Sequence, residues 1–217
     1  MVSILITAGP TREYLDDVRF LGNGSSGRMG CALAAAALAA GHAVTLVLGP
    51  VEVQPPAGAN VVPVVSALEM QAAADRAFDQ ADIAIAAAAV ADWRPAERLP
   101  GKPRRGAESV SLRLVPNPDI VAGLAARKGR RVVIGFALES ASAGMAAAIE
   151  RGREKLQRKH LDAVVVNLHD TIGREAGEFV VCHRDGHDEP LPRAGKDQVA
   201  ARIVALATEL WQQGRTS

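Results

Sequence analysis

The sequence predicts an α/β fold: a doubly wound, mostly parallel, Rossmann-like sheet with an antiparallel C-terminal edge. Short runs rich in Val and Ile alternate with Ala-rich helical patterns along most of the 217 residues, which is typical of βαβ units. Apolar residues make up 48% of the chain but aromatic residues only 3%. The core must therefore consist of Ala, Val, Leu and Ile, as in a sheet covered by helices. We expect one domain over residues 1–217.

The apolar runs and the helical patterns define the individual elements. We predict strands at Ser3–Thr7, Ala43–Leu48, Val61–Val65, Ile83–Ala88, Arg131–Phe136 and Ala163–Asn167. We predict helices at Ser25–Ala40, Ala67–Asp79, Pro118–Arg127 and Ala141–Lys159. The tail predicts an antiparallel hairpin and a last helix, at Glu178–Arg184, Glu189–Leu191 and about Lys196–Gln213.

Charge and cysteine content narrow the class of protein. There are 25 basic and 24 acidic residues, and the net charge is +1, so bulk electrostatics gives no reason to expect a nucleic-acid partner. Cys31 and Cys182 are far apart and read as free thiols of a reducing compartment. No stretch reads as a leader or a membrane span, so we expect a cytoplasmic location and no membrane partner.

Ligands of open parallel sheets bind at the carboxyl ends of the strands. Gly9 follows the first predicted strand, and the segment Gly22–Gly27 opens the first long helix. Its glycines allow close approach of the backbone, and a helix N-terminus attracts a phosphate. We therefore expect a phosphate or substrate loop at Gly9, Gly24, Ser25, Ser26 and Gly27, although plain helix capping would also explain the two serines.

The segment Gly22–Gly27 also matches the G-x-G-x-x-G pattern of an NAD(P)-binding oxidoreductase. That fingerprint must directly follow the first strand, and an acidic residue should end the second strand. Here Ala8 to Leu21 intervene, and the second predicted strand runs into Gly49 and Pro50. The sequence therefore disfavours this alternative.

Three further groups carry both a functional and a structural interpretation. Asp92 follows a run of small residues and could bind ribose hydroxyls, or it could cap a turn. Asn117-Pro118-Asp119 is good helix-capping chemistry by itself. Lys155 and Lys159 share one helix face, which suits a triphosphate but also fits a solvated basic face. The Pro-, Gly- and Arg-rich segment 91–109 fits no element and reads as a basic flap over an anion or as a linker.

Several linked motifs together resemble the phosphopantothenate–cysteine ligase family over nearly the whole chain. They are Ile6–Glu13, Val18–Phe20, Asn23–Gly30, Ala87–Pro95, Asn117–Ile120, Gly135–Glu139, Lys155-Leu156 with Lys159, Asp162 and Asn167, Leu191-Pro192 and Gly195-Lys196.

This resemblance implies a two-step reaction in coenzyme A biosynthesis. The carboxylate of 4′-phosphopantothenate attacks the α-phosphate of a nucleoside triphosphate, typically CTP, with Mg²⁺ as the divalent cation. The amine of cysteine then displaces the nucleotide to form an amide. The resemblance also implies a homodimer. It implies no flavin on this chain, because the flavin-dependent decarboxylase half of the common fusion is absent from this sequence. That half could be a separate polypeptide, or this chain could be a domain cut from a fusion. A non-catalytic nucleotide-binding relative is the other alternative, and retention of Asn23 and Lys102 argues against it.

Residue roles follow from the same resemblance. Lys102, in the flap, would stabilise charge at the reacting phosphate and carboxylate, and Asn23 would orient the acyl group and assist the second step. Residues of the nucleotide site would be Ala86, Ala87, Ala88, Asp92, Lys102, Asn117, Pro118, Asp119, Ile120, Phe136, Lys155 and Lys159. No metal ligand is assigned.

The sequence also departs from the family pattern at several places. Gly22 replaces a common serine, Gly24 a common arginine and Arg28 a common lysine. In addition, Tyr14 and Asp17 stand where prolines are frequent. In the flap, Pro103 follows Lys102 and stiffens the turn.

Overall fold

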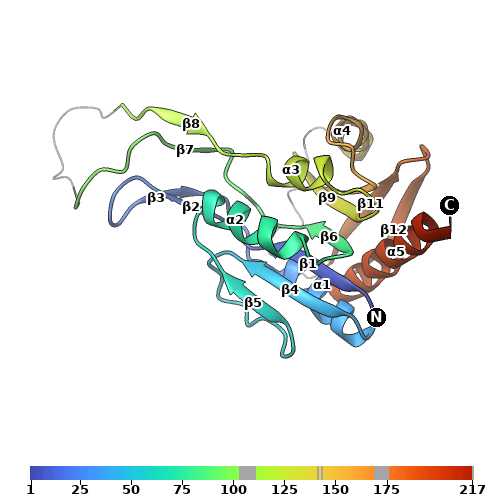
Figure 1. Cartoon of the computed structure of the whole chain (residues 1–217). Helices are drawn as coiled ribbons and strands as arrows, with labels where there is room; N and C mark the ends of the chain where they lie inside the picture. The colour runs from blue at the N-terminus through green and yellow to red at the C-terminus, as the bar shows by residue number, and fades with distance from the viewer. Residues whose placement is uncertain (103–110, 141, 143, 169–175, 217) are drawn as a thin grey trace.

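The computed structural model describes residues 1–102, 111–140, 142, 144–168 and 176–216, and its centre is an eight-stranded sheet. The strands are β1 (Ser3–Ala8), β4 (Ala43–Leu48), β5 (Asn60–Pro63), β6 (Ile83–Ala86), β9 (Val132–Glu139), β10 (Ala163–Leu168), β11 (Ala176–His183) and β12 (Asp188–Gly195). Their order is β12-β11-β10-β9-β6-β1-β4-β5. Six neighbouring strands of this sheet are parallel: β10, β9, β6, β1, β4 and β5. Strands β11 and β12 form the antiparallel edge. The predicted fold class is confirmed (Figure 1).

In the described ranges, five helices cover the two faces of this sheet. They are α1 (Arg28–Ala39), α2 (Ala67–Phe78), α3 (Ile120–Ala126), α4 (Gly144–Arg158) and α5 (Lys196–Thr216). Side chains alternate between two cores: in β1, Ile4 and Ile6 pack with α1 and α5, whereas Leu5 packs with α2, α3 and α4. Both cores are filled almost wholly by aliphatic side chains, as the composition predicts. Among the described residues, no helix has the length and apolar character needed to cross a membrane.

The chain reverses direction across the sheet between β1 and β6. After β1 the chain crosses through α1 to β4 and β5 on one side, and α2 then returns it to β6 on the other side. Such a switch point leaves a crevice at the carboxyl ends of its two strands. The fold therefore places a ligand site there.

Two small ribbons were not predicted. Strands β2 (Arg12–Tyr14) and β3 (Phe20–Gly22) form one, and β7 (Trp93–Pro95) and β8 (Leu114–Pro116) form the other. They extend together away from the sheet, and we call them the arm (Figure 1). Strand β7 lies inside the segment 91–109 that was expected to be irregular, and residues 103–109 lie outside the described residues. Strands of three residues are too short to show a period of two, which explains why the sequence did not reveal them.

Two helix starts differ from the prediction. Helix α1 begins at Arg28 rather than Ser25, because Gly27 takes the capping position in a left-handed conformation with φ of 73°. Helix α3 is capped by Asp119, whose carboxylate accepts from the amide of Ala122 at 3.1 Å. Asn117 and Pro118 therefore precede the helix. The predicted start of α4 at Ala141 lies outside the described residues, and the helix is described from Gly144.

Candidate functional site

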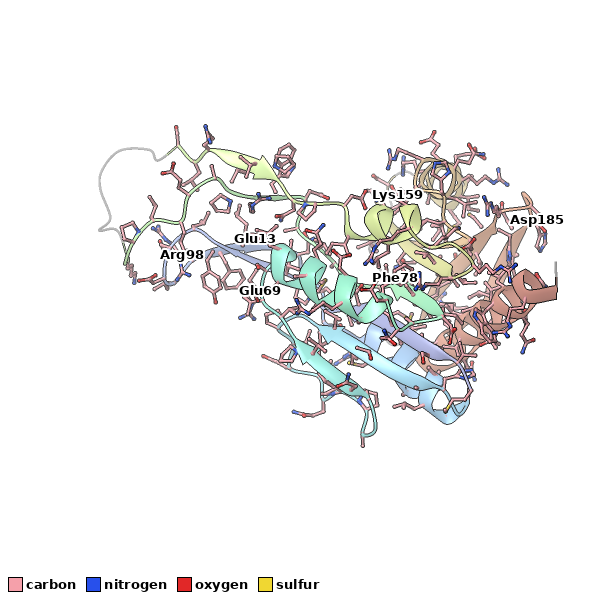
Figure 2. All side chains as sticks on the ribbon, viewed as in Figure 1. Glu13, Glu69, Phe78, Arg98, Lys159 and Asp185 are labelled. Atoms are coloured by element: carbon pink, nitrogen blue, oxygen red, sulfur yellow. The ribbon has the colours of Figure 1, made fainter. Side chains whose placement is uncertain are left out.

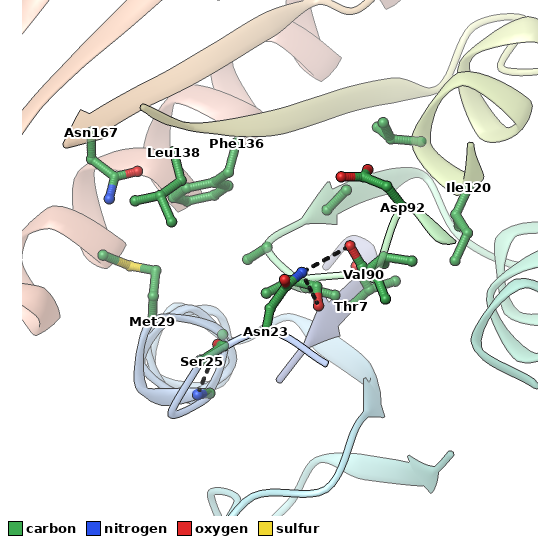
Figure 3. A pocket seen from close by; sticks show the side chains of 18 of the residues that line it. Thr7, Asn23, Ser25, Met29, Val90, Asp92, Ile120, Phe136, Leu138 and Asn167 are labelled. Carbon is green, nitrogen blue, oxygen red and sulfur yellow. Dashed lines mark hydrogen bonds between the residues drawn. The ribbon is translucent and has the colours of Figure 1, made fainter. Parts of the chain in front are cut away.

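A cavity of about 660 Å³ opens at the carboxyl ends of the central strands (Figure 3). It is lined by the ends of β1, β6, β9 and β10, by the loop that leads into α1, and by the segment that leads into α3. This is the crevice that the switch point between β1 and β6 predicts.

The cavity brings together most of the predicted site residues. Those that line it are Asn23, Gly24, Ser25, Ser26, Gly27, Ala86, Ala87, Ala88, Asp92, Asn117, Pro118, Asp119, Ile120, Phe136, Lys155 and Lys159. Two predicted residues do not line it. Gly9 lies behind the wall, and Lys102 is an exposed residue at the end of the described part of the arm.

Alanine backbone forms one wall of the cavity. Beyond β6 the chain leaves the sheet, and the amide of Ala87 donates to the carbonyl of Thr7 at 3.0 Å. The amide of Ala89 donates in the same way to the carbonyl of Gly9 at 2.9 Å. Gly9 thus supports the wall through its carbonyl. Since no side chain beyond a methyl group projects from Ala86 to Ala89, a flat ring or a sugar can approach the backbone closely.

The glycine–serine loop delivers the N-terminus of α1 to the cavity. Helix α1 has no side-chain cap, because Gly27 occupies that position. Ser25 Oγ instead accepts from the Gly27 amide at 3.4 Å (Figure 3). The amides of the first helical turn have no partners within the helix, so they can donate hydrogen bonds to a phosphate.

Asn23 ties this loop to the alanine wall. Its Nδ2 donates to the carbonyl of Val90 at 3.0 Å and to that of Ala89 at 3.2 Å (Figure 3). An amide nitrogen has two hydrogens, so these contacts occupy its donors. Oδ1 of Asn23 is the atom that can accept from a ligand.

Lys155, in α4, and Lys159, one residue beyond its end, both line the cavity, and each contacts a neighbouring element. Lys155 Nζ donates to the carbonyl of Phe136 at 2.5 Å, and Lys159 Nζ pairs with the Asp119 carboxylate at 2.6 Å. Burial and the adjacent charge of Lys159 lower the pKa of Lys155 to about 8. Partial burial acts to raise the pKa of Asp119, but hydrogen bonds from Lys159 and from the Ala122 amide outweigh it, and the pKa is lowered. The interpretation of these lysines as a merely solvated face does not fit these contacts.

Asn117 fastens the base of the arm to the cavity. Its Nδ2 donates to the Ala91 carbonyl at 2.8 Å, and its Oδ1 accepts from Arg94 at 3.2 Å. The amide of Asn117 also donates to the Asp92 carbonyl at 2.8 Å. Asp92 is therefore held at the rim, close to the point where the arm begins.

The charges around the cavity favour a polyanion. Within the part of the chain that the structure describes, its lining contains four basic residues, Arg28, Lys155, Lys159 and Lys196, and two acidic ones, Asp92 and Asp119. Among the described residues, no group of three or more His, Cys, Asp or Glu side chains is placed to hold a metal ion. One or two carboxylates with substrate phosphates are a usual environment for Mg²⁺, and the cavity offers that number of carboxylates.

Several lining residues were not assigned a role from the sequence. Lys196 directly follows β12, and Asn167 lies near the end of β10. Both therefore lie where a strand ends, like the site residues that were predicted. Met29 and Leu138 add apolar surface to the lining that contains Phe136 (Figure 3), and Phe179 also belongs to this lining. Phe179 belongs to an antiparallel strand, and no sequence signal linked that strand to the site.

Fold and site together define a doubly wound α/β domain with a basic, alanine-walled pocket whose charge suits an anionic ligand. The model of the DNA/pantothenate metabolism flavoprotein C-terminal domain family matches residues 1–210. The chain belongs to this family.

Related proteins agree with this assignment. The Escherichia coli K12 coenzyme A biosynthesis bifunctional protein CoaBC is 46% identical over 170 residues, which are 76% of this chain and 41% of that protein. A cysteine/cysteine sulfinic acid decarboxylase of an unknown prokaryotic organism is 42% identical over 207 residues, covering 93% of this chain and 56% of that protein. The crystal structure of a C-terminal domain of CoaBC superposes with a TM-score of 0.80 at 34% identity, covering 96% of this chain and 95% of that one. The chain thus spans about half the length of the curated relatives it matches.

Proposed function

We propose that this domain is a phosphopantothenate–cysteine ligase that uses CTP and Mg²⁺. The observation that supports this most directly is that one cavity unites Asn23, the uncapped N-terminus of α1, and Lys155 and Lys159 in a member of this family. The reaction needs a site for a triphosphate beside a site for an activated acyl group, and a pocket of this charge and volume fits both.

In the first step, an oxygen of the 4′-phosphopantothenate carboxylate attacks the α-phosphorus of CTP. The bond to the bridging oxygen breaks and pyrophosphate leaves. Amides at the start of α1 would donate hydrogen bonds to the phosphates, and so would Lys155 and Lys159. Mg²⁺ would neutralise phosphate charge, with Asp92 and Asp119 as the nearest protein carboxylates. The ribose would bind at Asp92, and the alanine wall with Phe136 and Ile120 would enclose the nucleoside.

In the second step, the cysteine amine attacks the acyl carbon. The bond from carbon to the nucleotide oxygen breaks, CMP leaves, and the nitrogen loses a proton. Asn23 Oδ1 is suited to accept a hydrogen bond from that amine, because the donors of its amide already bind the wall. In the first step, before pyrophosphate leaves, Lys102 would stabilise the charge that develops at the phosphate and the carboxylate.

Release of pyrophosphate from each of the four nucleoside triphosphates tests this proposal. We expect release with CTP only when phosphopantothenate is present, and amide formation only when cysteine is added. Lys102→Ala should slow release by roughly 10²–10³, as expected for one preorganised charge contact. Nucleotide binding without any pyrophosphate release would instead identify a non-catalytic relative.

The arm supports a further part of the proposal, namely that the protein is a homodimer. Seven large apolar side chains of the arm and of the neighbouring start of α2 are exposed: Val18, Phe20, Val65, Leu68, Trp93, Leu112 and Leu114. Isolated two-stranded ribbons are only marginally stable in water, and an exposed apolar patch of this kind marks an interaction surface. A second copy of the chain is the partner that we propose for it.

A further inference from the structure

The Leu15–Arg19 turn, at the outer end of β2 and β3, is built around one buried carboxylate. Asp16 accepts from the amides of Val18 and Arg19 at 2.8 Å each and from Arg19 Nε at 2.7 Å. Hydrogen bonds from these amides lower the pKa of Asp16 to about 2. The amide of Leu15 closes the turn on the Arg19 carbonyl at 2.8 Å. The turn is therefore a fixed point at the far end of the arm.

The segment just before Lys102 docks on this turn through its backbone. The amide of Leu99 donates to the Leu15 carbonyl at 2.8 Å, and the amide of Asp17 donates to the Gly101 carbonyl at 3.2 Å. Gly101 directly precedes Lys102. A proline at position 17 would have no N–H, so the second contact requires a residue other than proline at this position.

Arg98 adds side-chain contacts to the same docking. Its Nη2 pairs with Asp17 Oδ1 at 2.8 Å, and its guanidinium carbon lies 5.3 Å from the centre of the Tyr14 ring. Figure 2 shows Arg98 at the outer end of the arm, far from Lys159 in the cavity. Tyr14 and Asp17, two positions at which this sequence departs from the family pattern, thus converge on one arginine.

We propose that Arg98 is a positioning residue for Lys102. Held by Tyr14 and Asp17, it keeps Leu99–Lys102 against the Leu15–Arg19 turn and so fixes the position of Lys102 on the arm. This inference rests on the proposed function, since it assigns Arg98 an effect on catalysis only through Lys102.

Arg98→Gln and Asp17→Asn test the contact, because both keep the backbone amides and remove one charge. We expect faster hydrogen exchange at the amides of Leu99 and Asp17 in each variant. The turnover number of pyrophosphate release should fall about two- to five-fold, the range set by an exposed ion pair. The KM for the nucleotide should change less than two-fold. A fall in turnover with unchanged exchange would overturn the inference.

Two combinations separate positioning from general destabilisation. Arg98→Glu should slow release more than Arg98→Gln, since two carboxylates then face each other, and adding Asp17→Lys should restore part of the rate. In a Lys102→Ala background, Arg98→Gln should have no further effect. An equal loss in that background would show that Arg98 acts without Lys102 and would overturn the inference.

Arg127→Gln is the matched control. It breaks ion pairs of similar exposure with Asp75 and Asp79 on the α2–α3 side, and we expect no change in turnover or in exchange of the arm. If the wild-type chain releases no pyrophosphate from any nucleotide, the proposed function fails and the role of Arg98 fails with it. If the wild type is active and the Arg98 variants show wild-type turnover and hydrogen exchange, the proposed function stands and the inference about Arg98 is wrong.

Discussion

At the scale of single residues, the contacts of Asn23 give the clearest mechanistic expectation. Its Nδ2 faces two carbonyl oxygens, those of Ala89 and Val90. An ionised aspartate at this position has the same shape but places a negative oxygen against both carbonyls, where it can donate nothing.

We therefore expect Asn23→Asp to impair the second step more than the first. The loop would detach from the wall, and the added charge would oppose correct placement of the acyl-nucleotide for attack by cysteine. The acyl-nucleotide should accumulate, and mass spectrometry of a quenched reaction detects it. Asn23→Ser serves as a control, because it removes the amide without adding charge. Turnover of Asn23→Asp at the wild-type rate would show that Asn23 only caps the loop.

Lys155 predicts a pH dependence of stability. Its pKa falls from 10.5 to about 8 on folding, so between these values the unfolded chain binds more protons than the folded one. Stability must then rise with pH across this window relative to a variant without the amine. We expect the unfolding free energy of the wild type minus that of Lys155→Met to increase by about 1–3 kcal/mol from pH 8 to 10.5. Urea titrations at several pH values measure this difference, and a flat difference would contradict the burial of Lys155.

Nucleotide affinity should depend on pH in the opposite direction to stability. Phosphates near Lys155 favour its charged form, so the nucleotide should bind most tightly below pH 8 and more weakly above it. The dissociation constant of CTP, measured by calorimetry from pH 7 to 9.5, should rise in the wild type. In Lys155→Met it should be weaker throughout and less dependent on pH. Equal affinities of the two proteins at pH 7 would remove Lys155 from the phosphate site.

At the scale of elements, the helices were predictable because each shows one apolar face, whereas the positions of their ends were not. Gly27 adopts a left-handed conformation that only its tertiary surroundings require, with Val51 packed against it. The partner carbonyls of Asn23 lie 66 and 67 residues away in the sequence, and the ion pair of Lys159 with Asp119 joins two different helices. No local pattern contains such pairings, so the sequence could indicate which residues gather at the strand ends but not how they bond there.

The packing of α1 on β1 depends on Gly30. A methyl group at this position would lie 2.2 Å from Ala8 Cβ and 3.1 Å from its Cα. We expect Gly30→Ala to destabilise the protein by about 1–3 kcal/mol through overpacking and to shift the N-terminus of α1 at the cavity. Gly123, inside α3, has open space around it, and Gly123→Ala should stabilise by about 0.5–1 kcal/mol. The urea midpoints of the two variants, compared with the wild type, test this pair. A change in the same direction for both variants would contradict the packing described here.

A similar comparison applies to two glycines that replace common family residues. A side chain at Gly22 would meet the Thr11 carbonyl oxygen at 2.8 Å, whereas nothing lies within 4 Å of a side chain at Gly24. Within this arrangement of the arm, a serine at position 22 requires a backbone shift, while an arginine at position 24 has room. Gly22 thus avoids a clash with the Thr11 carbonyl, whereas position 24 in the lining of the cavity has space for a side chain.

At the scale of the whole molecule, the fold class was predictable because strand and helix patterns alternate over most of the chain. The arm was not, because its ribbons contain three-residue strands and its exposed apolar side chains belong to neither of the two described cores. Their exposure is explained if they meet a second copy.

We expect Leu114→Lys to weaken self-association. The substitution places a charge within the exposed apolar surface of the arm, and burying an unpaired charge at an interface is costly. Sedimentation velocity should show a dimer for the wild type and a shift toward monomer for the variant. Gln80→Lys, with the same change of charge at an exposed position beyond α2, is the control and should remain dimeric. A wild type that stays monomeric at micromolar concentration would contradict the proposed homodimer.

The chain has two tryptophans, and the fold puts them in contrasting surroundings. Trp93, in the arm, is 53% exposed, whereas Trp211, in α5, packs against the core and under the guanidinium of Arg215. The intrinsic fluorescence of the protein therefore contains one component sensitive to the solvent and one that is shielded. Covering the arm would move the emission of Trp93 to shorter wavelength and protect it from iodide quenching, while that of Trp211 would hardly change. The molecule carries its own optical probe for the state of the arm, readable on dilution without any label.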